Sequence, residues 1–175
     1  MDLIRTVEGL REQGHLGPTA GAFGSPDEVL LLSTGPASHL AKHSMIARPP
    51  RCRAVVRQPE SADHVPDPSN PLKAEPEWSS EGELKATVQI WSSGAWHDKQ
   101  QVSAPTLDDL MRTLEDVMLN PQPFVSRVEG WPQRPFLSGA FAYDLVQWTQ
   151  PIKIRHVPES KALLAVLWVV EGALL

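Results

Sequence analysis

The chain has 175 residues, of which 41% are apolar and 21% are charged, and its formal net charge is −5. These values are typical of a globular protein, and we expect residues 1–175 to form a single domain. The acidic balance, without a cluster of Lys and Arg, argues against nucleic acid or a membrane surface as a partner, because phosphate binding needs clustered positive charge.

The cysteine content and the N-terminal sequence predict a cytoplasmic protein. Cys52 is the single cysteine and has no second thiol to pair with, and the first residues lack the apolar segment of a signal peptide. The longest apolar run, Ala162–Val170, is too short to span a bilayer.

The first third of the chain predicts one helix and two strands. Apolar residues recur at helical spacing in Met1–Gln13. Glu28–Ser33 is an unbroken apolar run between turn signals and predicts a strand buried on both faces. Within Ser38–Pro50 we expect one helical turn before the prolines, and Arg53–Arg57 predicts a strand.

The middle of the chain predicts a loop and then a hairpin. Gln58–Gly82 contains five prolines and little apolar periodicity, so we expect a flexible surface loop. Glu83–Ser103 alternates around a Ser-Ser-Gly turn, as a β-hairpin does, and Trp91 and Trp96 should pack together beside the turn.

The clearest helix is predicted at Thr106–Met118. Thr106 is suited to the N-cap, and two aspartates follow in the first turn, where the helix dipole favours them. Four acidic residues should face solvent, namely Asp108, Asp109, Glu115 and Asp116. One apolar stripe should face a sheet, formed by Leu107, Leu110, Met111, Leu114 and Met118.

The end of the chain is rich in predicted strands, at residues 135–148 and 161–175. Gly139 should let the chain pass close to a neighbouring element, Tyr143 should bury its ring, and Asp144 should fix the turn that follows. The final apolar strand should be covered on both faces, with its covering layer supplied from outside this chain. These elements predict an α+β fold with a layered, largely antiparallel sheet and flanking helices.

Chemical motifs do not assign a catalytic residue or a metal site. His39 and His43 would share one helix face and leave a zinc enzyme as an alternative, but Leu40 stands where a metalloprotease has its glutamate. Cys52 lies between two arginines, which would lower the pKa of its thiol, but no histidine partner is close in sequence.

Two segments resemble, in order, the N-terminal domain of anthranilate synthase component I, a chorismate-utilising enzyme. "EVLLLSTGPASHLAKHSMIARPPRCRAVV" resembles the family's "xxLLES…G…RYSxIGxxPxxxL", and "GAFAYDLVQWTQPI" resembles "GYxxYDxVRxxEPI". The hairpin and the helix lie between them, where the family has a strand pair and a helix. The resemblance runs from Glu28 to the end, with departures at Leu32, Ala142 and Gln147, where the family has Glu, Gly and often Arg.

The resemblance implies a function that needs a second part. The chain would have the fold of the N-terminal half of the large subunit and serve as its scaffold and regulatory region in tryptophan biosynthesis. Chorismate would be converted to anthranilate only with a catalytic C-terminal half, which holds the chorismate pocket and Mg²⁺ and is absent from this chain. A glutamine amidotransferase subunit would be a further partner. This chain could be a separate subunit that binds the catalytic half, or a truncated fragment of a longer protein.

The resemblance also implies an effector site. In feedback-inhibited members a Glu-Ser pair and a polar residue about ten positions later help to hold tryptophan. Transferred by position, the effector-binding residues would be Leu32, Ser33, His43 and Ser44. The resemblance also implies a separate structural motif, formed by Gly139, Tyr143 and Asp144. Leu32 accepts no proton from an ammonium group, which removes a bond of about 1.5–3 kcal/mol and weakens effector binding.

Three alternatives remain open besides the zinc enzyme. The chain could be the same region of an aminodeoxychorismate synthase, which serves folate synthesis, or of an isochorismate synthase. It could also be a stand-alone module that binds an amino acid without catalysis.

Overall fold

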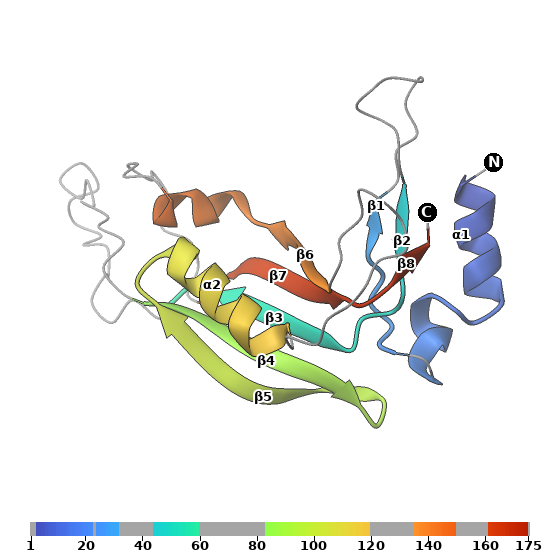
Figure 1. Ribbon diagram of the computed structural model, residues 1–175, viewed down its shortest axis with the longest axis horizontal. Helices are drawn as coiled ribbons and strands as arrows, with labels where there is room; N and C mark the ends of the chain where they lie inside the picture. Colours follow the sequence, from blue (N-terminus) through green and yellow to red (C-terminus); the bar gives the residue numbers. More distant parts are fainter. Residues whose placement is uncertain are drawn as a thin grey trace, which may run out of the picture.

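The computed structural model describes residues 3–22, 24–31, 44–59, 83–119, 135–149 and 161–174. Within these ranges the protein is α+β, with two antiparallel sheets, two α-helices and two 3₁₀-helices (Figure 1). The predicted α+β class with largely antiparallel strands is therefore confirmed. Neither α-helix is long and apolar enough to cross a membrane.

The larger sheet has five strands in the order β5-β4-β3-β7-β6, and each neighbouring pair is antiparallel. Its strands are β3 (Cys52–Arg57), β4 (Leu84–Ser92), β5 (Ala95–Ala104), β6 (Phe136–Phe141) and β7 (Leu163–Val170). The strand predicted at Arg53–Arg57 and the final apolar strand are both present, and they pair with each other in the centre of this sheet.

Strands β4 and β5 form the predicted hairpin. The turn consists of Ser93 and Gly94, whose φ angles of 51° and 79° suit a two-residue turn that follows the twist of the strands. Trp91 and Trp96 pair across it with ring centroids 5.5 Å apart in an edge-on arrangement. The predicted Trp–Trp packing is confirmed.

Helix α2 (Leu107–Met118) packs on one face of the larger sheet. The Thr106 hydroxyl accepts a hydrogen bond from the Asp109 amide at 3.1 Å, so the predicted N-cap is confirmed. The apolar stripe of the helix faces the sheet, and the four acidic residues are exposed. The resulting core includes Ala54, Val56, Leu84, Ala86, Val88, Val102, Leu110, Leu114, Leu164, Leu167 and Val169.

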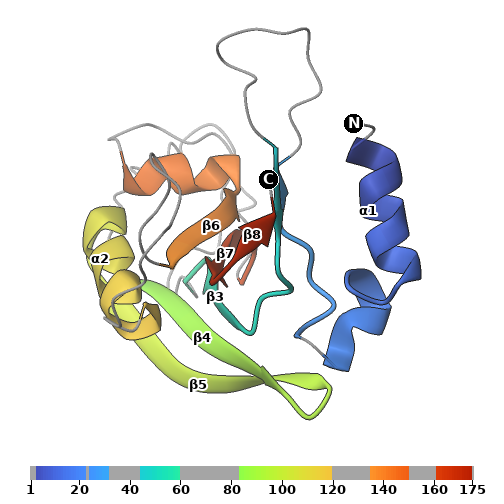
Figure 2. The ribbon, with the colours of Figure 1, turned by 45° about the vertical axis from the view of Figure 1, so that its right-hand side comes forward.

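The smaller sheet has three strands in the order β1-β2-β8. They are β1 (Leu30–Leu31), β2 (Met45–Ala47) and β8 (Ala173–Leu174). Helix α1 (Leu3–Glu12) and the 3₁₀-helix η1 (Gly17–Ala22) lie on this side of the molecule, away from α2 (Figure 2). The predicted N-terminal helix is therefore present.

Two predictions for the segments of the smaller sheet differ from the structure. The strand expected at Glu28–Ser33 is present as β1 among the described residues, but it is not buried on both faces, since Leu31 is 62% exposed. Met45–Ala47 form a strand where part of a helical turn was expected. The rest of that expected turn, residues 38–43, and most of the expected loop, residues 60–82, lie outside the described residues.

The covering of β7 also differs from the prediction. Its core-facing residues, including Leu164, Leu167 and Val169, are buried in the same cluster as α2 and the 3₁₀-helix η2 (Tyr143–Trp148). One face of the final strand is thus covered by this chain itself, and the expectation of an external layer is wrong for that face.

Candidate functional site

The predicted effector residues fall mostly outside the described part of the chain. Leu32, Ser33 and His43 lie outside the described residues, as does His39. Ser44 is half-buried and directly precedes β2, in which Met45 pairs with Leu31 of β1. Of the four residues, the structure therefore places Ser44 alone, beside the β1–β2 pair.

Gly139 makes the close approach that the sequence predicted. It lies in β6 opposite Leu167 of β7. A Cβ atom at this position would stand 2.5 Å from the carbonyl oxygen of Val166 and 2.6 Å from Cδ2 of Leu167, well inside ordinary contact distance. Because the blocking oxygen belongs to the backbone of the paired strand, glycine is the residue that fits without displacing that strand.

Tyr143 contradicts the prediction that its ring is buried, because it is 85% exposed. The reason is the 3₁₀-helix that follows β6. In η2 the side chains of Leu145 and Trp148, three positions apart, enter the core, which leaves Tyr143 on the outer side. Asp144 is half-buried in the first turn of η2, but the N-cap position belongs to Ala142.

Three large apolar side chains are exposed where β6 ends and β7 begins. They are Phe141, Tyr143 and Leu163, with exposed fractions of 54%, 85% and 49%, and we call them the apolar corner. The strands meet here through a 2.8 Å hydrogen bond from the Ala142 amide to the Leu164 carbonyl. Phe141 and Tyr143 of the segment that carries the family resemblance are thus exposed, whereas Leu145 and Trp148 of the same segment are buried.

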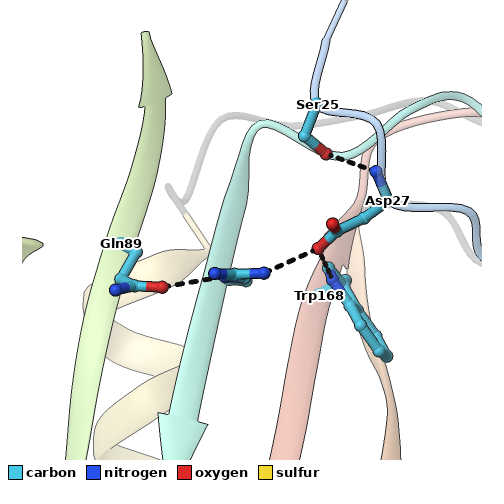
Figure 3. Close-up of polar contacts among 5 residues, drawn as sticks. Ser25, Asp27, Gln89 and Trp168 are labelled. Carbon is cyan, nitrogen blue, oxygen red and sulfur yellow. Dashed lines mark hydrogen bonds and ion pairs between the residues drawn. The ribbon is translucent and has the colours of Figure 1, made fainter. Parts of the chain in front are cut away.

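A polar network that the sequence did not predict crosses the sheet face opposite α2. The Asp27 carboxylate accepts hydrogen bonds from Arg53 of β3 at 3.0 Å and from the Trp168 indole of β7 at 2.8 Å (Figure 3). The amide of Asp27 itself donates to the Ser25 hydroxyl at 3.3 Å. These contacts fix the segment before β1 onto the two central strands.

The network continues from Arg53 toward the hairpin. Nε of Arg53 donates to the side-chain oxygen of Gln89 in β4 at 2.8 Å. The side-chain amide nitrogen of Gln89 in turn donates to the Asp98 carboxylate in β5 at 2.7 Å. The guanidinium also lies 4.2 Å from the ring centre of Trp96, within range of a cation–π contact. Arg53 and Asp27 form a charge-assisted hydrogen bond with each other. We therefore interpret this network as a structural contact and not as a reactive centre.

A second ion pair joins helix α1 to the segment before β1. Nε of Arg11 donates to the Glu28 carboxylate at 2.8 Å, and a terminal guanidinium nitrogen donates to its other oxygen. This hydrogen-bonded guanidinium holds the pKa of Glu28 below its usual range. Both acids of the "PDEV" sequence, Asp27 and Glu28, therefore hold the N-terminal region in place.

Two observations on the described residues bear on chemistry, one on the Cys52 thiol and one on metal binding. Burial raises the pKa of the Cys52 thiol, so the lowered pKa expected from its neighbouring arginines is wrong and the thiolate is disfavoured. No group of three or more His, Cys, Asp or Glu side chains among the described residues is arranged to hold a metal ion.

Comparisons with known proteins return no match: no family model, no curated protein and no solved structure is similar to the chain at a significant level. The resemblance of its motifs to anthranilate synthase component I therefore stays a prediction.

Proposed function

We propose that this chain is the N-terminal scaffold and regulatory region of an anthranilate synthase component I-like protein. In this proposal it acts in tryptophan biosynthesis with a chorismate-binding catalytic half, which supplies Mg²⁺ and the reacting groups, and with a glutamine amidotransferase subunit that supplies ammonia. The observation that carries the proposal is the apolar corner, where Tyr143 of the family-like motif is exposed.

The chemistry of the apolar corner favours a polypeptide partner over a metabolite. Chorismate carries two carboxylates, and a site for it needs cationic or hydrogen-bond-donating groups. The corner consists of two aromatic side chains and a leucine. Aromatic side chains are enriched at the surfaces through which proteins bind one another.

The order of elements gives further support. The hairpin and the capped helix α2 lie between the two segments that carry the resemblance, as the resemblance leads us to expect.

Binding of the catalytic half tests this proposal. The chorismate-binding half of an anthranilate synthase large subunit, produced as a separate polypeptide, should form a complex with the chain in calorimetry. Tyr143→Ala should weaken that complex, since Tyr143 is the most exposed residue of the corner. Ile4→Ala is the matched control, because Ile4 is an apolar, 58% exposed side chain on α1. Absence of a complex, or equal effects of both substitutions, would contradict the proposal.

Regulation by tryptophan is tested at Leu32. Replacing Leu32 with glutamate restores the acid that the family uses, and a charge-assisted bond of about 1.5–3 kcal/mol should tighten L-tryptophan binding by about 10- to 100-fold. Ser44→Ala should weaken the binding of both the parent chain and the Leu32→Glu variant. Failure of both parent and Leu32→Glu chains to bind tryptophan in calorimetry would remove the effector role.

A further inference from the structure

The two edges of the five-stranded sheet differ in how they are protected. Edge strand β5 carries His97, Asp98 and Lys99, and its register with β4 shifts near Gln89. Charges and register irregularities of this kind hinder the addition of another strand. The opposite edge strand, β6, has the sequence FLSGAF, without charge or proline, and pairs with β7 in unbroken register.

The hydrogen-bonding groups of β6 can be assigned from the ladder. The Ala142 amide donates a hydrogen bond to the Leu164 carbonyl, and these two residues continue the β6–β7 register by one position. In an antiparallel ladder every second residue bonds to the same neighbour, so Ala140 and Ser138 also bond to β7. The amide and carbonyl groups of the residues between them, Leu137, Gly139 and Phe141, therefore face the open edge. Gly139, Ala140 and Phe141 are exposed and Leu137 is half-buried, and among the described strands β6 pairs with β7 alone, so its other edge is open in the described part of the chain.

The open edge is self-complementary about Gly139. In an antiparallel pair of two β6 strands, a register centred on Gly139 places Gly139 opposite itself and Leu137 opposite Phe141 of the second copy. All three outward-facing residues of each strand are then paired, which gives about six backbone hydrogen bonds. The half-exposed Phe141 ring gains an apolar neighbour, and no like charges are opposed.

We propose that β6 is the interface of a symmetric homodimer, in which the two five-stranded sheets join into one continuous sheet. A two-fold axis at Gly139 closes the assembly and leaves no unpaired copy of this edge. One short strand buries less than the roughly 1,600 Å² of a standard interface, so the dimer should be weak and dependent on concentration. The inference goes beyond the proposed function, but Phe141 belongs both to β6 and to the apolar corner. The dimer would therefore cover part of the surface proposed for the catalytic half, and it is tested on the chain without that half.

A pair of substitutions at Phe141 tests strand pairing by analytical ultracentrifugation. Phe141→Pro removes an amide that faces the open edge and keeps the bonds to β7, whereas Phe141→Thr loses the same ring but keeps the amide. With rising concentration the parent chain should approach twice the monomer mass. The threonine variant should still dimerise, although more weakly, and the proline variant should stay monomeric. A parent chain that stays monomeric, or equal loss in both variants, overturns the proposal.

Hydrogen exchange gives a second readout that does not need the proline variant to fold. In the parent chain the amides of Leu137, Gly139 and Phe141 should gain protection as concentration rises, while those of Ser138 and Ala140 stay protected throughout. If the three outward-facing amides exchange fast while a dimer is present, the dimer uses another surface. If they are equally protected in the monomer, this edge is already covered. Either result overturns the proposal.

Discussion

Replacing Gly139 with alanine should destabilise the protein through a single added methyl group. The new Cβ would lie 2.5 Å from the Val166 carbonyl oxygen, which is 0.9 Å short of the 3.4 Å at which ordinary contact begins. The Leu167 methyl group, at 2.6 Å, can rotate away, but the carbonyl belongs to the paired strand and moves only with it. The strands β6 and β7 must therefore separate locally.

The expected magnitude follows from two opposing effects. Overpacking costs typically 1–3 kcal/mol, and because the obstacle is backbone we expect about 2–3 kcal/mol here. Alanine restricts the unfolded chain more than glycine does, which offsets about 0.4–1 kcal/mol. The net loss in the free energy of unfolding is about 1–2.5 kcal/mol, or a fall in Tm of about 2–10 °C for a chain of this length.

Urea unfolding measures this loss, with Gly9→Ala as the matched control. Gly9 lies within helix α1, and a Cβ there would meet no atom within 4 Å. The same glycine-to-alanine change should therefore stabilise the protein by about 0.5–1 kcal/mol, because alanine favours the helix. Opposite signs at the two glycines are the expected signature. A Gly139→Ala variant as stable as the parent would refute the close approach.

Three further contacts can be tested by substitution and urea unfolding. Thr106→Ala should cost about 1 kcal/mol by removing the cap of α2, and Thr106→Ser should restore most of it. Asp27→Ala should lower the free energy of unfolding by about 1–3 kcal/mol, because Arg53 and Trp168 lose their acceptor. Asp98→Ala is its control, since it removes one exposed hydrogen bond and should change stability little. Arg11 lowers the pKa of Glu28 in the folded state below the unfolded value of about 4.5. The ion pair therefore stabilises the folded protein fully at pH values above about 4.5. This stabilisation is lost as the pH falls through the lower pKa of the folded state. Glu28→Gln should therefore be less stable than the parent at pH 7, with the difference shrinking toward pH 3. A constant difference would contradict the ion pair.

Local sequence patterns predicted the elements that local interactions determine. The stripe and cap of α2, the Ser93–Gly94 turn and the apolar run of β7 each depend on residues close together in sequence, and all three are present. The close approach at Gly139 was also predicted, since a glycine within a strand commonly marks a position where another backbone comes near.

Predictions that depended on distant neighbours were less successful. Tyr143 lies in an apolar stretch, but the 3₁₀ turn of η2 sends other side chains to the core. The bonds of Asp27 join residues 26 and 141 positions apart, which no local pattern reports. Cys52 lies between arginines in sequence, yet as a strand residue its side chain packs against the core on the other face from Arg53.

Anthranilate formation tests the proposed function most directly. The chain alone, supplied with chorismate, Mg²⁺ and ammonium, should produce no anthranilate fluorescence above the uncatalysed background. Addition of a separately produced chorismate-binding half should give a complex in which anthranilate accumulates. Accumulation of aminodeoxychorismate or isochorismate instead would assign the region to the corresponding enzyme. Turnover of chorismate by the chain alone would contradict the account.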